Sequence, residues 1–394
     1  MAIELAPLPL PPSVDVMQFR DVGREVKGVD PGSANPAELE ELKTLLFKHD
    51  ILLFRDCRLS PEKQYALAKI FDPSSETFGH GNNKIDRTKK SILHPYLKTI
   101  PRVPQVQLIG NGAVYDHEGI PEAHLKHASH TAFHKTHISP ADAAAGATRF
   151  YRWHMDAALY ELDPPVVTTL YALAVPRGAP QVVRYDDGKG DELPVPLATT
   201  AFVSGRTMFE VLPPELKSLA VRTRVRYAPH PFQWMAPAGA MSDGLGLETE
   251  GKERPLSELT EWSEEDVKVY PVLWKNPVTK GLHFMVNATA AQELFVAPLP
   301  DSASREGRLF PNGAHITDLK EVRELLHKMQ RPGISPNQLT KLITTYHAEA
   351  AIPRGKTGPR ENALTHYRAW WAAACVGLAT RRYHMPFKRR YVTG

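Results

Sequence analysis

Cysteine and long apolar runs are what this chain of 394 residues has least of. Its two cysteines, Cys57 and Cys375, lie far apart in the sequence, which argues against a disulfide framework or a thiolate metal site and favours a reducing compartment. No run of about 18 apolar residues occurs, so we expect no membrane-spanning segment. The N-terminus lacks the basic start and continuous apolar stretch of a signal peptide. We therefore expect a cytoplasmic protein.

Charge of one sign is also scarce, because 48 Lys and Arg face 44 Asp and Glu, a net charge of only +4. Much of that excess lies near the C-terminus, in Arg381, Arg382, Lys388, Arg389 and Arg390. We therefore expect no nucleic-acid partner. The 35 prolines indicate many turns and irregular connections rather than a helical bundle.

Short elements dominate the secondary structure that the sequence predicts. A helix beginning at Asn35-Pro36, a strand over 51–54 and a helix beginning at Ser60-Pro61 form a helix–strand–helix module over 36–72. Further strands are predicted over 103–109, 166–175, 267–274 and 282–286, and helices over 215–221 and 319–329. The pattern predicts a mainly β core with helices, in a single catalytic domain over 1–394 that carries a turn-rich insertion over 176–270.

One motif stands out for its chemistry. His154 and Asp156 lie two residues apart, just before the β-like run 166–171. On a strand, residues i and i+2 point to the same face, so both side chains could bind one ion. A second histidine from an adjoining strand would complete a two-histidine, one-carboxylate face, which suits non-haem Fe(II) and dioxygen. The triplet alone is common; the alternative is a buried hydrogen-bonded histidine and a turn or cap aspartate.

Several segments resemble the taurine-dioxygenase-like branch of the Fe(II)/2-oxoglutarate-dependent oxygenases, most closely its xanthine dioxygenases. The resemblance covers about residues 45–335 and is carried by 49–56, 59–64, 150–159, 184–205, 227–231 and 273–277. It implies a double-stranded β-helix (jelly-roll) core that uses ferrous iron, dioxygen and the co-substrate 2-oxoglutarate. The implied reaction is hydroxylation of xanthine to urate, with release of succinate and carbon dioxide, and the implied first two ligands are His154 and Asp156.

The resemblance also implies a distal histidine ligand, followed by an arginine that binds the far carboxylate of 2-oxoglutarate. His366, with Arg381 or Arg382, fits the end of that pattern, because a guanidinium can bond both oxygens of a carboxylate. The preceding stretch, 353–360, does not have the expected apolar strand.

A competing assignment takes His347, which follows the apolar run 342–346, with Arg360 as the carboxylate-binding arginine. We favour His366, while a third interpretation leaves both histidines without metal and the arginines in a solvated tail. Residues 336–394 form a divergent C-terminal part. Two other functions therefore stay open: an oxygenase acting on another small acid or sulfonate, and a catalytically impaired family member.

The remaining candidates concern the co-substrate and the substrate. Gln181 stands where family members usually carry a threonine beside the 2-oxoglutarate carboxylate. For a purine, the resemblance implies four substrate-binding residues: Gln105, Gln107, Lys126 and Asp142. The histidine-rich stretch 124–137 is interpreted as a loop, and 186–188 as a turn.

Overall fold

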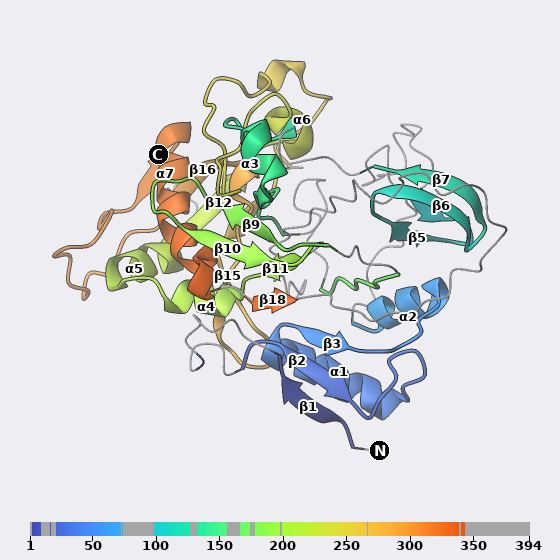
Figure 1. Ribbon diagram of the computed structural model, residues 1–394. Coiled ribbons are helices and arrows are strands. Elements are labelled where there is room, and N and C mark those ends of the chain that lie inside the picture. Colours follow the sequence, from blue (N-terminus) through green and yellow to red (C-terminus); the bar gives the residue numbers. More distant parts are fainter. Residues whose placement is uncertain are drawn as a thin grey trace.

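The computed structural model describes residues 2–8, 16, 21–71, 73, 98–126, 132–155, 166–173, 178–197, 199–265, 267–338 and 340–342 (Figure 1). The helices are α1 (Pro36–His49), α2 (Pro61–Phe71), α3 (Pro140–Ala144), α4 (Gly205–Glu210), α5 (Pro214–Arg222), α6 (Pro231–Met235) and α7 (Leu319–Gln330). Short 3-10 turns are η2 (Leu256–Glu258), η3 (Ala288–Ala290), η4 (Arg331–Ile334) and η5 (Pro336–Gln338).

The strands are short and belong to several small sheets. The first nine are β1 (Glu4–Pro7), β2 (Arg24–Lys27), β3 (Leu52–Phe54), β4 (Lys98–Ile100), β5 (Val103–Leu108), β6 (Gly112–His117), β7 (Ile120–Leu125), β8 (Ala147–Thr148) and β9 (Gln181–Arg184). The others are β10 (Glu192–Val195), β11 (Thr200–Phe202), β12 (Thr223–Tyr227), β13 (Val269–Pro271), β14 (Leu273–Lys275), β15 (Leu282–Phe284), β16 (Ala291–Val296), β17 (Ala314–Ile316) and β18 (Thr340–Leu342). The prediction of a β-rich fold with helices is confirmed.

The N-terminal elements form where the sequence predicted them. Asn35 begins α1 with a capping box: its side chain accepts from the N–H of Glu38, whose carboxylate accepts from the N–H of Asn35. Strand β3 and helix α2 follow, as expected. Helix α1 lies against the sheet β1-β2-β3, at the bottom of Figure 1.

A four-stranded sheet, in the order β13-β12-β16-β17, lies at the centre of the main core. Val225 of β12 pairs with Leu294 of β16, and both side chains are buried. Helix α7 packs on β16 through Val322, Leu326 and Met329, a helical spacing that places all three on one face. The helix begins at Asp318, whose carboxylate accepts the N–H of Glu321, as the sequence predicted.

The stretch 176–270 contributes strands and side chains to the main core. It supplies β9 to β12, and Val183, Tyr185 and Leu193 belong to the same buried cluster as the residues of β16 and α7. The turn over 186–188 connects β9 to β10 of that core. The insertion over 176–270 stays a prediction, although side chains from this stretch lie in the main core.

The strand predicted over 166–175 was wrong in its described part, 166–173. Val166 packs instead against Phe47 and Phe71 of the N-terminal helices. The Nε2 of Gln64 donates to the carbonyl oxygen of Thr169 at 3.2 Å, which occupies a backbone acceptor that a sheet partner would use. A short apolar run can be buried by side-chain packing as well as by strand pairing, and periodicity does not separate the two.

A second, smaller core lies under the strands β4 to β7, at the right of Figure 1. It contains Ile100, Leu108, Ile120, Ala123 and Leu125. Strands β4 and β5 pair with each other, as do β6 and β7, and β4 contacts β7. Within the described part of the chain, no helix is both long and apolar enough to cross a bilayer.

Candidate functional site

The segment 149–155 carries the first predicted metal ligand, and neighbouring backbone holds it in place. It follows β8 and is not itself a strand, so strand alternation does not set the direction of His154. Trp153 is buried; its backbone N–H donates to the carbonyl oxygen of Gly244 at 2.9 Å, and its indole Nε1–H to that of Asp243 at 3.0 Å. Two hydrogen bonds thus fix the residue next to His154.

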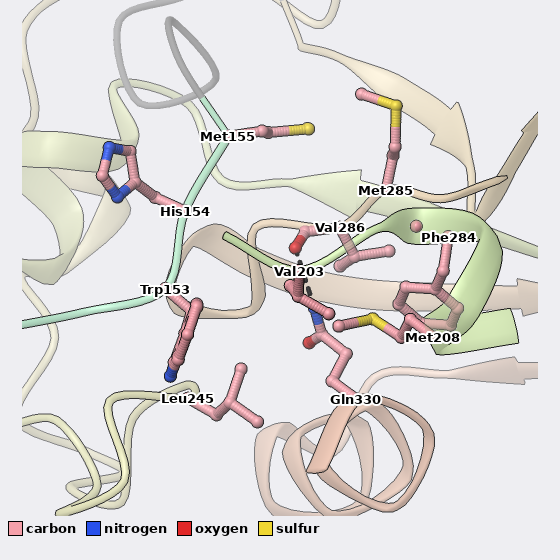
Figure 2. Close-up of a pocket in the computed structure, with 11 residues that line it drawn as sticks. Trp153, His154, Met155, Val203, Met208, Leu245, Phe284, Met285, Val286 and Gln330 are labelled. Atoms are coloured by element: carbon pink, nitrogen blue, oxygen red, sulfur yellow. Dashed lines mark hydrogen bonds between the residues drawn. The ribbon is translucent and has the colours of Figure 1, made fainter. Parts of the chain in front are cut away.

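His154 has a hydrogen-bonding arrangement that suits a metal ligand. The side chain is half-buried, and its Nδ1 lies 3.3 Å from the carbonyl oxygen of Arg152. An Nδ1–H that donates to a carbonyl leaves the lone pair on Nε2, which is how metal-binding histidines are commonly oriented. In Figure 2, the ring lies on the opposite side of the chain from the Met155 side chain.

The other predicted ligands, Asp156, His366 and the alternative His347, lie outside the described residues, as do Arg360, Arg381 and Arg382. Among the residues that are described, no group of three or more His, Cys, Asp or Glu could hold a metal ion. His154 therefore fits an iron site by its own chemistry. The rest of the donor set would have to come from residues beyond the described ones.

A cavity of about 30 Å³ lies beside the same segment, on the Met155 side (Figure 2). Its lining is mostly apolar: Trp153, His154, Met155, Val203, Gly205, Met208, Leu245, Phe284, Met285, Val286 and Gln330. The buried amide of Gln330 donates from Nε2 to the carbonyl oxygen of Val286 at 2.9 Å, while its Oε1 has no partner within the described structure. Such a space suits one water rather than a purine.

The predicted substrate residues lie elsewhere. Gln105 and Gln107 are alternate residues of β5 and share a face, and exposed Lys126 follows β7. Asp142 lies in α3, where its carboxylate accepts from Ser139 and pairs with Arg184 at 3.2 Å. None of these four lines the cavity at Trp153.

Gln181, the predicted co-substrate residue, begins β9. That strand pairs in parallel with β8, where Val183 lies opposite Thr148, directly before the segment that carries His154. The structure thus brings the strand of Gln181 next to the start of this segment.

The sequence predicted a turn over 186–188 but not that this acidic turn, with Asp191 after it, binds two buried arginines. Asp186 has positive φ (50°), as a turn residue would, but its carboxylate also accepts from the buried Arg149 at 2.6 Å. Asp187 and Asp191 bind Arg331, whose guanidinium lies 4.8 Å from the ring of Tyr185. Two adjacent aspartates and an arginine at the start of the metal motif were the available clues.

The acidic turn makes stability depend on pH. Burial alone would raise the pKa of Asp186 and Asp187, but hydrogen bonds from Arg149, Arg184 and Arg331 hold both pKa values below the ordinary 3.8. A carboxyl group with a lowered folded pKa stabilises the fold above its unfolded pKa. That contribution is lost as the pH falls through the folded pKa.

The buried side chain of His134 also contributes to the pH dependence of stability, at higher pH. Its Nε2 is 2.7 Å from the carbonyl oxygen of Tyr151, and burial lowers its pKa from 6.5 to about 4. Between these values the unfolded chain binds the extra proton, so acidification from pH 6.5 to 4 should cost about 3 kcal/mol of unfolding free energy. Urea unfolding across this range would measure it. His134→Gln should flatten this part of the profile, and an unchanged slope would contradict the assignment.

Comparisons with known proteins agree with the resemblance. The sequence pattern of the family described as "Taurine catabolism dioxygenase TauD, TfdA family" matches residues 8–331. The chain is 44% identical over 339 residues to the alpha-ketoglutarate-dependent xanthine dioxygenase of Schizosaccharomyces pombe, covering 86% of this chain and 78% of that protein. It is 47% identical to the Neurospora crassa xanthine dioxygenase over 322 residues, covering 80% and 73%. For the Emericella nidulans protein, the identity is 43% over 336 residues, covering 85% of each chain.

Proposed function

The chain belongs to the taurine catabolism dioxygenase TauD, TfdA family, and from that premise we propose that it hydroxylates xanthine to urate. The reaction consumes dioxygen and 2-oxoglutarate and releases succinate and carbon dioxide. The observation that carries the proposal is 43–47% identity, over 80–86% of this chain, to three proteins named as xanthine dioxygenases. The antiparallel pairs β9–β10, β12–β16 and β14–β15 support a double-stranded β-helix core.

In this proposal, His154, Asp156 and His366 hold ferrous iron. The support within the described residues is the Nδ1 contact of His154, which orients Nε2 as the ligating atom. When bound, iron supplies the oxidation chemistry, with 2-oxoglutarate as the source of electrons. Trp153, fixed by two hydrogen bonds, orients the histidine next to it.

The co-substrate and substrate residues are proposed from the same resemblance. Arg381 or Arg382 binds the far carboxylate of 2-oxoglutarate, and the amide of Gln181 donates to a carboxylate of the same molecule. Gln105, Gln107 and Lys126 offer donors and acceptors to the edge of a flat polar ring. Asp142 is the fourth candidate; because Arg184 and Ser139 already bind it, it would have to exchange these partners to meet a substrate.

The direct test is reconstitution. Purified protein loaded anaerobically with Fe(II) should consume oxygen and 2-oxoglutarate and form urate in equal amounts when xanthine and air are added. Succinate formed with taurine or another small acid, but not with xanthine, would leave the oxygenase assignment and reject the substrate. No succinate with any substrate would reject the enzyme.

The distal ligand can be assigned by paired substitutions. His366→Ala should abolish Fe(II) binding and urate formation, because removal of one of three ligands weakens metal binding more than the 10–100-fold loss typical of a residue that only contacts a ligand. His347→Ala should leave both Fe(II) affinity and urate formation within about twofold of the unaltered protein. Anaerobic Fe(II) titration measures the affinity directly. The reverse result would assign His347, with Arg360 in place of Arg381 and Arg382.

A catalytically impaired family member is the second candidate function. The observation that favours it is that the family match ends at residue 331, before every candidate for the distal ligand and for the carboxylate-binding arginine. Tight binding of xanthine without turnover, together with failure of both His366→Ala and His347→Ala to change Fe(II) affinity, would support this alternative.

A further inference from the structure

Helix α7 carries a row of basic residues that faces carboxylates from three other segments. Arg323, His327 and Arg331 follow at intervals of four, which places them along one side of the helix and its C-terminal end. Each has an acidic partner: Arg323 pairs with Glu253, His327 with Asp243, and Arg331 with Asp187 and Asp191. The side chains of Arg323 and Arg331 are buried, and that of His327 is 23% exposed.

Asp243 is the member of this group that also touches the His154 segment. Its carboxylate is fully buried and accepts from Nε2 of His327 at 2.8 Å and from the N–H of Leu245 at 2.9 Å. The guanidinium of Arg331 is 3.7 Å away. The backbone oxygen of the same residue accepts the indole N–H of Trp153. One residue therefore joins α7 to Trp153.

The loop that contains Asp243 and Gly244 packs closely against the segment 149–155. Gly244 has φ +82°, and a Cβ there would lie 3.3 Å from Cδ1 of Trp153 and 3.4 Å from Cα of Arg152. Its carbonyl oxygen accepts the backbone N–H of Trp153. A displacement of the loop would therefore move Trp153 with it.

We propose that Asp243 is a positioning residue: anchored by His327 of α7 and by Arg331 just after it, Asp243 holds the loop that fixes Trp153, and thereby sets where the adjacent His154 presents its imidazole. This rests on the proposed function, in which His154 is a metal ligand. If the Asp243 carboxylate only stabilised the fold, its removal would lower the stability of the protein without a specific effect on the 150–155 segment or on metal affinity.

The test compares Asp243→Asn with Arg323→Gln. The asparagine keeps the size of the side chain and an acceptor for the N–H of Leu245. It removes the negative charge that pairs with His327 and Arg331. The matched control breaks the ion pair between Arg323 and Glu253, whose side chains are 4% and 5% exposed. Arg323 lies on the same side of α7 as His327. Both variants should lower the melting temperature.

Hydrogen–deuterium exchange of peptides covering 150–155, measured without metal, gives the first readout. Asp243→Asn should raise exchange at the Trp153 amide at least about tenfold, and Arg323→Gln should leave it unchanged. Mn(II) binding by calorimetry gives the second: Asp243→Asn should weaken it 10–100-fold, the size typical of an outer partner of a ligand, and the control less than twofold. Equal effects of the two variants on exchange would overturn the proposal.

Gly244→Ala provides an independent variant that keeps every side chain of the network. It should raise exchange at Trp153 and weaken Mn(II) binding in the same sense as Asp243→Asn, and unchanged exchange would count against the proposal even if Asp243→Asn did not fold. Mn(II) binding and hydrogen–deuterium exchange test the proposed function and the positioning role of Asp243 separately. If the unaltered protein binds no Mn(II), the proposed function fails, while the exchange experiment still decides whether Asp243 positions the segment.

Discussion

Replacement of His154 by alanine is expected to remove Fe(II) binding and reduce urate formation to background. Loss of an outer partner alone typically weakens metal binding 10–100-fold, so loss of a ligand should exceed about 100-fold. Anaerobic Fe(II) titration and oxygen consumption with xanthine measure the two effects. We expect so large an effect because, in the proposed site, the Nδ1 contact with the carbonyl oxygen of Arg152 leaves Nε2 to bind the metal.

His315→Ala is the matched control for this experiment. His315 is an exposed histidine of β17 that pairs with Glu293 at 2.7 Å, and exposed pairs contribute at most about 1 kcal/mol. The His315→Ala variant should therefore bind Fe(II) and form urate like the unaltered protein. Turnover by His154→Ala within tenfold of that control would show that another residue holds the metal.

Arg331→Ala is expected to cause the largest loss of stability. The guanidinium is 2% exposed, and its removal would leave the carboxylate of Asp187, which is 6% exposed, without the arginine that bonds it. Breaking a buried ion pair by removing one partner typically costs about 3–5 kcal/mol. Urea unfolding at pH 7 should show that decrease as a lower midpoint.

Arg184→Ala separates burial from the mere presence of an ion pair. Arg184 bonds Asp186 at 2.9 Å and Asp142 at 3.2 Å, but its side chain is 32% exposed. Its loss should cost less than about 1 kcal/mol, because water screens and replaces such contacts. Equal destabilisation by the two substitutions would refute the claim that Arg331 is held by its buried setting.

Local features of the fold could be predicted wherever neighbouring residues along the chain decide them. The capping box at Asn35 and the Asp318 cap of α7 depend on side chains that reach only their own helix, so their residue types suffice. The strand predicted over 166–175 failed because its described part is held by Gln64 and by Phe47 and Phe71, more than 90 residues away. No local pattern contains that information.

The candidate site divides in the same way. His154 could be identified from the sequence because an imidazole and the carboxylate of Asp156 lie only two residues apart. What holds its neighbour Trp153, two hydrogen bonds to the backbone of Asp243 and Gly244, depends on a loop that meets this segment only after folding. Asp187 and Arg331 show the same limit: they are 144 residues apart, and only the packing of β9, β10 and α7 brings their charges together.

The sequence by itself determined the β-rich composition, the starts of α1 and α7, the family and the choice of His154. Those follow from short-range sterics, capping and the residue types that iron chemistry requires. Only the tertiary structure decided that 176–270 is part of the core, that an acidic turn neutralises Arg149 and Arg331, and that α7 bears on Trp153 through Asp243. Burial and long-range charge pairing depend on which surfaces meet, and a linear pattern of residues does not specify that.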